Sequence, residues 1–425
     1  MCYMYITKLK RYSGLLSWAQ KGLLAILDQA LFSGANFLVN ILLTRWLPPE
    51  EYGAFAVALS IYYLLLGFHT AVITEPMMVF GAGKYREQFR KYFGMVLWGH
   101  WGISALVALV LSISAWVFLQ LGSPFMAQAL FGLVIATPFW LLLWLTRRAC
   151  YAQLRTNDAV VGSGFNILAV VVGLFLLRRA GGISSLTGFV LLGATGGLAS
   201  LVLLKKLRPQ MAGYMGNPTP SILLADHWGY GRWSILGFLL YWASGQILML
   251  LIPIFLGLMA SAAVAATWTL YRPISQFMQA LNSLVLPAFS RLASEPDGQT
   301  HLRRKAIGVA GLFAGAAFLY ALTVSIFAKP ILHFLYAGKY DEHWMLIVLF
   351  GIAFVFSVMT GIFVSALKAV GRVRESTKVW LISVLGTVIL SVPSMLTLGV
   401  EGALMTFAGS YILAGLLAYR YMNKL

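Results

Sequence analysis

Long apolar segments alternate with short polar connectors along the whole of this sequence. Each apolar segment is long enough to cross a hydrocarbon core of roughly 30 Å as a helix, whose backbone satisfies its own hydrogen bonds. The pattern therefore predicts an all-α integral membrane protein. We predict about twelve membrane-spanning helices, near residues 22–46, 53–78, 93–119, 125–146, 159–177, 183–204, 234–256, 258–287, 306–328, 344–367, 379–398 and 402–419.

The basic residues are concentrated on alternate connectors. Of the 31 Lys and Arg residues, 25 lie in the N-terminal segment, the C-terminal tail and the even-numbered connectors. Five lie in the odd-numbered connectors or, as Arg45 does, at the adjoining end of a helix, and Arg272 alone lies in the middle of a predicted helix. Because cytoplasmic connectors are enriched in Lys and Arg, this asymmetry predicts that both termini are cytoplasmic.

Composition excludes several other classes of protein. The net charge of +18 could indicate nucleic-acid binding, but the cations flank helix ends, where they orient helices and contact anionic lipid. Cys2 and Cys150 both fall on the predicted cytoplasmic side, so we expect no disulfide. Phosphate-binding-loop, zinc-protease and serine-hydrolase motifs are missing from the sequence. We expect no enzymatic activity, no catalytic residue, no cofactor, no metal site and no nucleic-acid partner.

The chain divides into two halves of six predicted helices. The longest connector, 205–233, contains three prolines and separates residues 1–204 from residues 234–425. A weak repeat with an offset of 209 residues places Tyr62 on Tyr271, which favours parallel repeats. We therefore predict an N-terminal six-helix lobe (1–204), a cytoplasmic linker (205–233) and a C-terminal six-helix lobe (234–425).

Four segments resemble those of a known family. Residues 28–37, 42–53 and 75–78 resemble the start of a polysaccharide-exporter-type protein, and residues 334–340 resemble the outer loop before that family's tenth helix. This family is a branch of the multidrug/oligosaccharidyl-lipid/polysaccharide (MOP) exporter superfamily. The resemblance implies two six-helix lobes around a central cavity, and a protein that flips lipid-linked oligosaccharide across a bacterial inner (plasma) membrane.

The eighth predicted helix carries a polar stripe in an otherwise apolar segment. Long polar side chains are poor lipid-facing groups, so the stripe favours a wet cavity, although Arg272 could instead form a structural ion pair. Pro273 removes a backbone hydrogen bond and is expected to kink the helix. Residues at spacings of three and four form this stripe: Trp268, Arg272, Gln276, Gln279 and Ser283.

Other polar residues inside helices have two open interpretations. Asn36 and Asn40 share a face of the first helix with Gln29, and Gln246 lies on a face of the seventh helix. Such residues either line a cavity or hydrogen-bond neighbouring helices. Glycines at 193–197 and 311–315 have a small-xxx-small spacing, which predicts close helix packing.

Three titratable residues are candidates for ion coupling. They are Asp28 and Glu75, near predicted cytoplasmic helix ends, and His69 in the second helix. Each has an alternative role, because Asp28 and Glu75 can be hydrated or paired at the interface, and a buried histidine is more often only hydrogen-bonded.

These observations predict a transporter that flips or exports a lipid-linked glycan by alternating access. Arg272 would attract a diphosphate on a polyprenyl lipid, while Gln and Asn side chains would replace the hydration of the sugars. Membrane lipids and glycan-assembly proteins are candidate partners. A drug or cation extruder of the same fold would favour lone carboxylates over a central arginine. A membrane glycan polymerase or ligase would need a large outer loop, whereas the longest in this chain is 329–343.

The predicted topology can be tested with the two cysteines. A membrane-impermeant maleimide should label neither Cys2 nor Cys150 in intact spheroplasts, and should label at least one after permeabilisation. Labelling of either cysteine from outside would reverse the predicted orientation.

Overall fold

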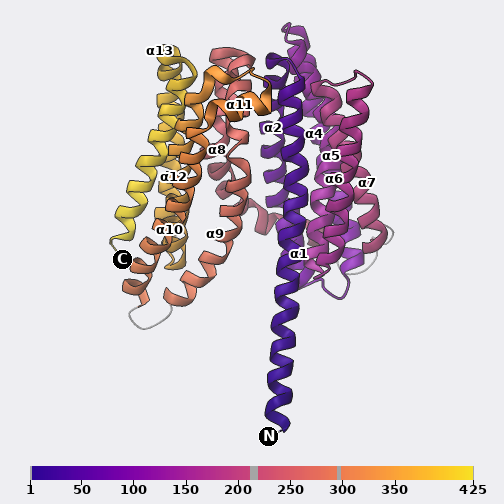
Figure 1. The fold of residues 1–425 in the computed structure, drawn as a ribbon. Coiled ribbons are helices and arrows are strands. Elements are labelled where there is room, and N and C mark those ends of the chain that lie inside the picture. The colour runs from indigo at the N-terminus through magenta and orange to yellow at the C-terminus, as the bar shows by residue number, and fades with distance from the viewer. Residues whose placement is uncertain (1, 211–218, 294–297, 425) are drawn as a thin grey trace. The chain divides into compact units, whose positions relative to one another are not determined.

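A computed structural model describes residues 2–210, 219–293 and 298–424, and every regular element in these ranges is a helix (Figure 1). The elements are α1 (Cys2–Trp46), α2 (Pro49–His69), the π-helix η1 (Thr70–Thr74), α3 (Glu75–Ala82), α4 (Phe89–Gln120), α5 (Pro124–Ala152), α6 (Thr156–Arg179), α7 (Ser185–Leu207), α8 (Pro220–Thr269), α9 (Arg272–Ala293), α10 (Gly298–Ile326), α11 (Ala328–Tyr336), the 3₁₀ helix η2 (Asp341–His343), α12 (Trp344–Ala369) and α13 (Val373–Met422).

Ten of the described helices are long and apolar enough to cross a membrane, judged by length and composition. Two of them contain a glycine in the left-handed region, Gly257 in α8 and Gly399 in α13, with φ angles of 82° and 62°. A non-helical glycine can reverse or bend a chain where other residues would be strained. Each glycine separates two predicted helices, and the eighth predicted helix comprises the end of α8 together with α9. The all-α membrane fold is confirmed.

The chain forms two compact units. The first comprises Met1–Val39 and Leu65–Ile235, and the second comprises Asn40–Leu64 and Leu236–Leu425. Helix α1 contributes to both units, and residues 40–64 belong to the second although they precede most of the first. The predicted linker is partly helical, because α8 begins at Pro220, and residues 220–235, which we call the arm, belong to the first unit.

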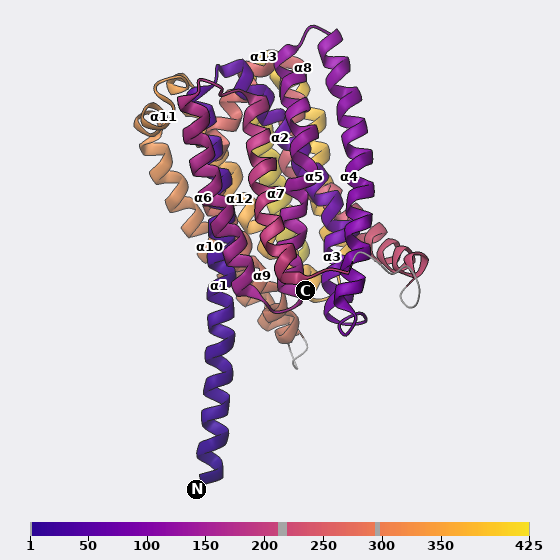
Figure 2. The ribbon, with the colours of Figure 1, turned by 90° about the vertical axis from the view of Figure 1, so that its right-hand side faces the viewer.

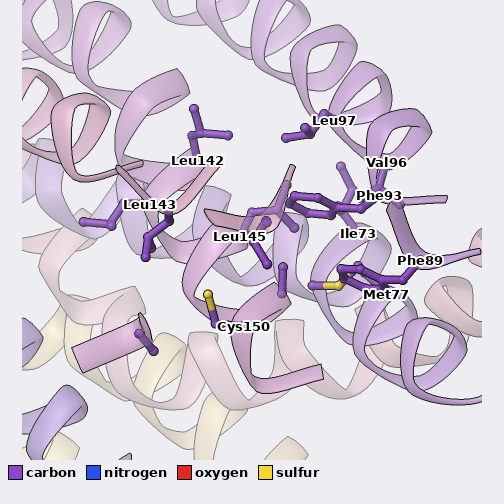
Figure 3. Packing of buried hydrophobic residues seen from close by; sticks show 14 of the residues in the cluster. Ile73, Met77, Phe89, Phe93, Val96, Leu97, Leu142, Leu143, Leu145 and Cys150 are labelled. Atoms are coloured by element: carbon purple, nitrogen blue, oxygen red, sulfur yellow. The ribbon is translucent and has the colours of Figure 1, made fainter. Parts of the chain in front are cut away.

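In the first unit, α5 packs against α3, α4, α6 and α7 (Figure 2). A Cβ atom on Gly193 would lie only 2.6 Å from the Ala136 Cα, so glycine allows α5 and α7 to approach closely. The close packing predicted for 193–197 is confirmed. A cluster of aliphatic and aromatic side chains, contributed by α1, η1 and every helix from α3 to α7, fills the space between these helices, and Figure 3 shows part of it. Cys150 is fully buried in this cluster, so maleimide labelling must rely on Cys2.

In the second unit, α12 packs against α9, α10 and α13. Among the described residues, no atom lies within 4 Å of a Cβ built on Gly311 or Gly315 of α10, so the close packing predicted for this pair is wrong. Gly53 is the opposite case. A Cβ there would lie 1.9 Å from the Leu258 carbonyl oxygen, which follows the Gly257 turn. The resemblance segment 42–53 therefore contains a packing glycine on which the contact of α2 with this turn depends.

Gly53→Ala should destabilise the second unit. The added methyl overlaps a backbone atom that has no flexible side chain to move, so we expect a loss of about 3 kcal/mol or more. The measurement is thermal unfolding of the detergent-solubilised protein. Gly315→Ala is the matched control, because it adds a methyl into open space in a helix and should preserve or raise the midpoint. Equal midpoints for both variants would contradict the packing assigned to Gly53.

Candidate functional site

The helix break between α8 and α9 positions Arg272 in the second unit. Helix α8 ends at Thr269, which leaves the last carbonyl groups of the helix without their usual amide partners. Tyrosine hydroxyls donate to two carbonyls in this region: Tyr336 to the Ala266 oxygen at 2.9 Å, and Tyr320 to the Leu270 oxygen at 2.6 Å. The break lies just before Pro273, which confirms the expected interruption.

Arg272 is therefore the first residue of α9, and its side chain is partly buried. Its Nη1 atom donates to the Tyr63 hydroxyl at 3.4 Å, and its guanidinium carbon lies 5.7 Å from the centre of that ring. Within the part of the chain that the structure describes, no carboxylate forms an ion pair with Arg272. A guanidinium presents five donors in a fixed fork, so this group retains the capacity to bind a phosphate or another oxyanion.

The other residues of the predicted stripe have different environments. Trp268 is partly buried and contacts the Phe350 ring at 5.1 Å, so it belongs to the packing of the second unit. Gln276, one turn after Arg272, is exposed. Gln246 in α8 accepts a hydrogen bond from the Ser60 hydroxyl at 3.3 Å. The side chain of Gln279 lies outside the described part of the structure, as does that of Ser283.

The polar face of α1 is partly hydrogen-bonded within the helix. Gln29 Nε2 donates to the Ser33 hydroxyl at 3.0 Å. Asn36 is partly buried, and Asn40 is 3% exposed, at the point where α1 passes from the first unit to the second. The role of Asn36 and Asn40 in a cavity stays a prediction.

Asp28 forms a buried ion pair with Arg147. The Arg147 Nη2 atom lies 2.6 Å from Asp28 Oδ2, Nε lies 3.2 Å from Oδ1, and both side chains are 2% exposed or less. Tyr151 and Ser163 also donate to this carboxylate. The guanidinium of Arg147 additionally stacks over the Phe32 ring.

Sequence reasoning missed this pair, because it placed Arg147 in a cytoplasmic connector. The structure continues α5 as far as Ala152, which places Arg147 inside the helix. An ion coupling role for Asp28 stays a prediction, but its carboxylate accepts four hydrogen bonds from three side chains. A buried carboxylate with this many donors is held as the anion, and breaking such a pair typically costs about 3–5 kcal/mol.

His69 also has a partner that the sequence did not predict. Its Nε2 atom lies 3.0 Å from Nδ1 of His100 in α4, and its Nδ1 atom lies 3.3 Å from the Thr74 hydroxyl. Both imidazoles are fully buried. The only signal for His100 in the sequence is a polar residue within the apolar third segment, and nothing in that pattern pairs it with His69.

Glu75 accepts a hydrogen bond from the Ser234 hydroxyl at 2.6 Å, and Ser234 belongs to the arm. Further contacts of Asp226 and His227 hold the arm against the rest of the first unit. Lys84 Nζ lies 2.6 Å from the Asp226 carboxylate, and His227 Nδ1 lies 3.0 Å from the Val72 carbonyl oxygen. Burial raises the pKa of Asp226, but the hydrogen bonds from Lys84 and Tyr85 outweigh it and lower that pKa. The arm is therefore a specific docked element of the first unit.

Three of the basic connectors meet at one groove of the first unit, with a volume of about 540 Å³. Arg86, Arg90 and Lys91 line it from one connector, and Arg155 lines it from another. Gln210, after the end of α7, donates its backbone N–H to the Arg90 carbonyl at 3.0 Å. Cations gathered at one end of the unit agree with the interpretation that these residues meet anionic headgroups at a membrane surface.

Comparison with known proteins adds the fold type. No protein-family model and no curated protein matches the sequence. The lipid II flippase MurJ in an inward closed conformation aligns with a TM-score of 0.68 at 14% identity, over 94% of this chain and 87% of that chain. An inward-facing multidrug resistance MATE family transporter of the MOP superfamily aligns with a TM-score of 0.68 at 14% identity, over 94% and 97% of the two chains.

The bent form of the Vibrio cholerae MATE transporter VcmN aligns with a TM-score of 0.57 at 18% identity, over 96% of this chain and 95% of that chain. Each of these proteins is a flippase or a transporter, which agrees with the prediction that this chain is not an enzyme. At such identities the likeness concerns the fold: this multi-pass membrane protein has the two-lobe helical fold of MOP superfamily transporters.

Proposed function

We propose that this chain flips or exports a lipid-linked oligosaccharide or polysaccharide precursor across a bacterial inner membrane by alternating access. The observation that carries the proposal is Arg272, a partly buried guanidinium in the eighth predicted span whose described polar partner is the Tyr63 hydroxyl. An arginine without a carboxylate partner is costly in a membrane, so it needs water or an anionic occupant. A diphosphate on a polyprenyl lipid supplies such an anion, and its sugars would use the Gln and Asn side chains near that path.

The organisation that we propose keeps the two six-helix lobes, 1–204 and 234–425, with a cytoplasmic linker at 205–233 and both termini in the cytoplasm. In this scheme the lobes alternate during transport, and Arg272 and Gln246 bind the substrate. The structural likeness to MurJ supports a lipid-linked substrate, because that protein is described as a lipid II flippase. Polysaccharide-assembly proteins would then act on the exported glycan.

A drug or cation extruder is the second candidate, because MATE transporters align with the chain as well as MurJ does. Recognition of a cation favours an available carboxylate. Both acidic candidates for ion coupling already have a partner in the structure, since Asp28 is paired with Arg147 and Glu75 accepts a hydrogen bond from Ser234. The basic residue at 272 therefore favours an anionic substrate over a cationic one.

Substitutions at Arg272 test this proposal in cells that depend on the chain for glycan export. Arg272→Gln should preserve the amount of protein in the membrane but reduce export about tenfold or more, because it removes a charge-assisted hydrogen bond to the diphosphate. Arg272→Lys should retain part of the export, since lysine keeps the charge but loses the fork. The measurement is surface glycan normalised to membrane protein.

Arg374→Gln is the matched control, because it removes an exposed arginine from a predicted cytoplasmic connector and should leave export unchanged.

Cells without the chain should accumulate lipid-linked glycan with its sugars on the cytoplasmic leaflet. Full export by Arg272→Gln at normal abundance would refute the substrate role of Arg272. Export of single repeat units that fail to lengthen in the deletion strain would favour a polymerase or ligase instead.

A further inference from the structure

The buried histidine pair of the first unit can bind one proton. His69 Nε2 and His100 Nδ1 are 3.0 Å apart, and the rings meet edge to face with centres 5.2 Å apart. At this contact one ring nitrogen donates and the other accepts, so a neutral pair shares a single hydrogen. One added proton converts the contact into a charge-assisted hydrogen bond, which is the stronger kind. A second proton is opposed by the positive charge already present.

Charged groups on the elements that pack against α4 and the π-helix have other partners. On α5, Arg147 pairs with Asp28, and Arg148 lies over the Trp144 ring at 4.3 Å. Glu75, which follows the π-helix, accepts from Ser234. Among the described residues no carboxylate forms an ion pair with either imidazole.

The uncharged neighbours of the pair are polar or aromatic. Trp101 on α4 contacts the His100 ring at 5.1 Å, and the Thr74 hydroxyl faces His69 Nδ1 at 3.3 Å. Neither neighbour carries a formal charge at neutral pH. Burial without a counter-ion opposes the added charge, so the pair is neutral at neutral pH and takes up its proton only in acid, where the two rings themselves hold it.

The π-helix Thr70–Thr74 begins directly after His69. Such single-turn π-helices are rare and often mark functional positions. A one-residue shift of register returns such a turn to an α-helix. Trp144 Nε1 donates to the Thr70 hydroxyl at 3.1 Å, so the start of this turn is tied to α5. The Thr74 contact with His69 ties its end to the imidazole pair. A change in the charge of the pair therefore acts directly on this turn.

The arm is docked on the same turn. His227 Nδ1 donates to the Val72 carbonyl oxygen at 3.0 Å, and the Tyr92 hydroxyl lies 2.8 Å from His227 Nε2. A Cβ on Gly231 would lie 3.0 Å from the Ala71 carbonyl oxygen, so the arm backbone contacts the turn closely. Beyond Ile235 the same helix α8 continues into the residues of the second unit.

We propose that His69 and His100 form a binding site for a single proton, and that occupancy of this site changes the register of the π-helix Thr70–Thr74 and thereby the docking of the arm. A proton can shift the equilibrium between two registers of this turn only as far as it binds more tightly to one register than to the other. The π and α registers provide two discrete arrangements, and the arm contacts the atoms that move between them. This inference does not depend on the identity of the transported substrate.

His227, which joins the arm to the π-helix, is also titratable. Its effect on docking must be separated from that of the His69–His100 pair. Burial lowers the pKa of His227, whereas the hydrogen bond to Val72 and the charge of Asp226 raise it by less. A histidine with a lowered pKa in the docked state stabilises docking above the pKa of the undocked state, about 6.5, and that stabilisation is lost as the pH falls. His227→Gln removes this titration but keeps an N–H donor for Val72.

The experiment uses the full-length protein in lipid nanodiscs, with and without His227→Gln. Nitrogen-15 NMR of the imidazoles follows the protonation of the histidines between pH 3.5 and 8. Hydrogen–deuterium exchange follows residues 70–82 and the arm over the same range. In the His227→Gln protein, we expect His69 and His100 to take up one proton together. Exchange in both segments should change with the same midpoint.

Adding His69→Gln or His100→Gln should abolish this pH dependence, and adding His333→Gln, at an exposed residue of α11, should leave it intact. Imidazoles that stay neutral down to pH 3.5 in the folded protein with both histidines would overturn the proposal, whether or not the substituted proteins fold. Exchange that still follows pH without the pair would also overturn it. If the unsubstituted chain exports no glycan but its histidine pair titrates as expected, that result counts against the flippase proposal alone.

Discussion

A chain inside hydrocarbon must satisfy every backbone hydrogen bond within its own segment or by a side chain, and the rest of this structure depends on that constraint. It makes the described elements helical, and it makes each interruption of a helix expensive unless a donor replaces the lost partner. At the α8–α9 break the Tyr336 and Tyr320 hydroxyls supply donors to backbone carbonyls. At the π-helix, His227 supplies one to the Val72 carbonyl. Each of these two interruptions is therefore stabilised by side-chain donors. Each also lies next to a charged or titratable side chain, Arg272 or His69.

Arg147 and Arg272 illustrate how the same charge can lie in two different environments. Arg147 is 2% exposed, is bonded twice to Asp28 and lies over an aromatic ring, so its charge is neutralised within the fold. Arg272 starts a helix beside a tyrosine hydroxyl and lacks an ion-pair partner among the described carboxylates. Replacing Arg147 would leave a buried anion unpaired, which is a stability effect. Replacing Arg272 removes a charge that no described carboxylate neutralises, which is why we propose an anionic occupant for it.

The sequence predicts the elements of this protein better than their contacts. Apolar segment length specifies the membrane helices, and Pro273 and Gly257 mark interruptions because their backbone chemistry is local. The pairing of Asp28 with Arg147 joins residues 119 positions apart, and no periodicity within one helix encodes it. Basic-residue counting even placed Arg147 outside the helix. His100 was missed for the same reason, and the exposure of Gln276 shows that a shared helix face does not define a shared environment.

We propose that this chain moves an anionic, lipid-linked glycan between leaflets. The most direct measurement reconstitutes the purified protein in vesicles containing a polyprenyl-diphosphate oligosaccharide in both leaflets. An impermeant enzyme added outside then removes accessible sugars. The account predicts that the protein exposes the inner-leaflet pool to the enzyme, so nearly all the glycan is cleaved. If half the glycan stays protected while the same vesicles extrude a lipophilic cation, the glycan account is wrong and the cation extruder is supported.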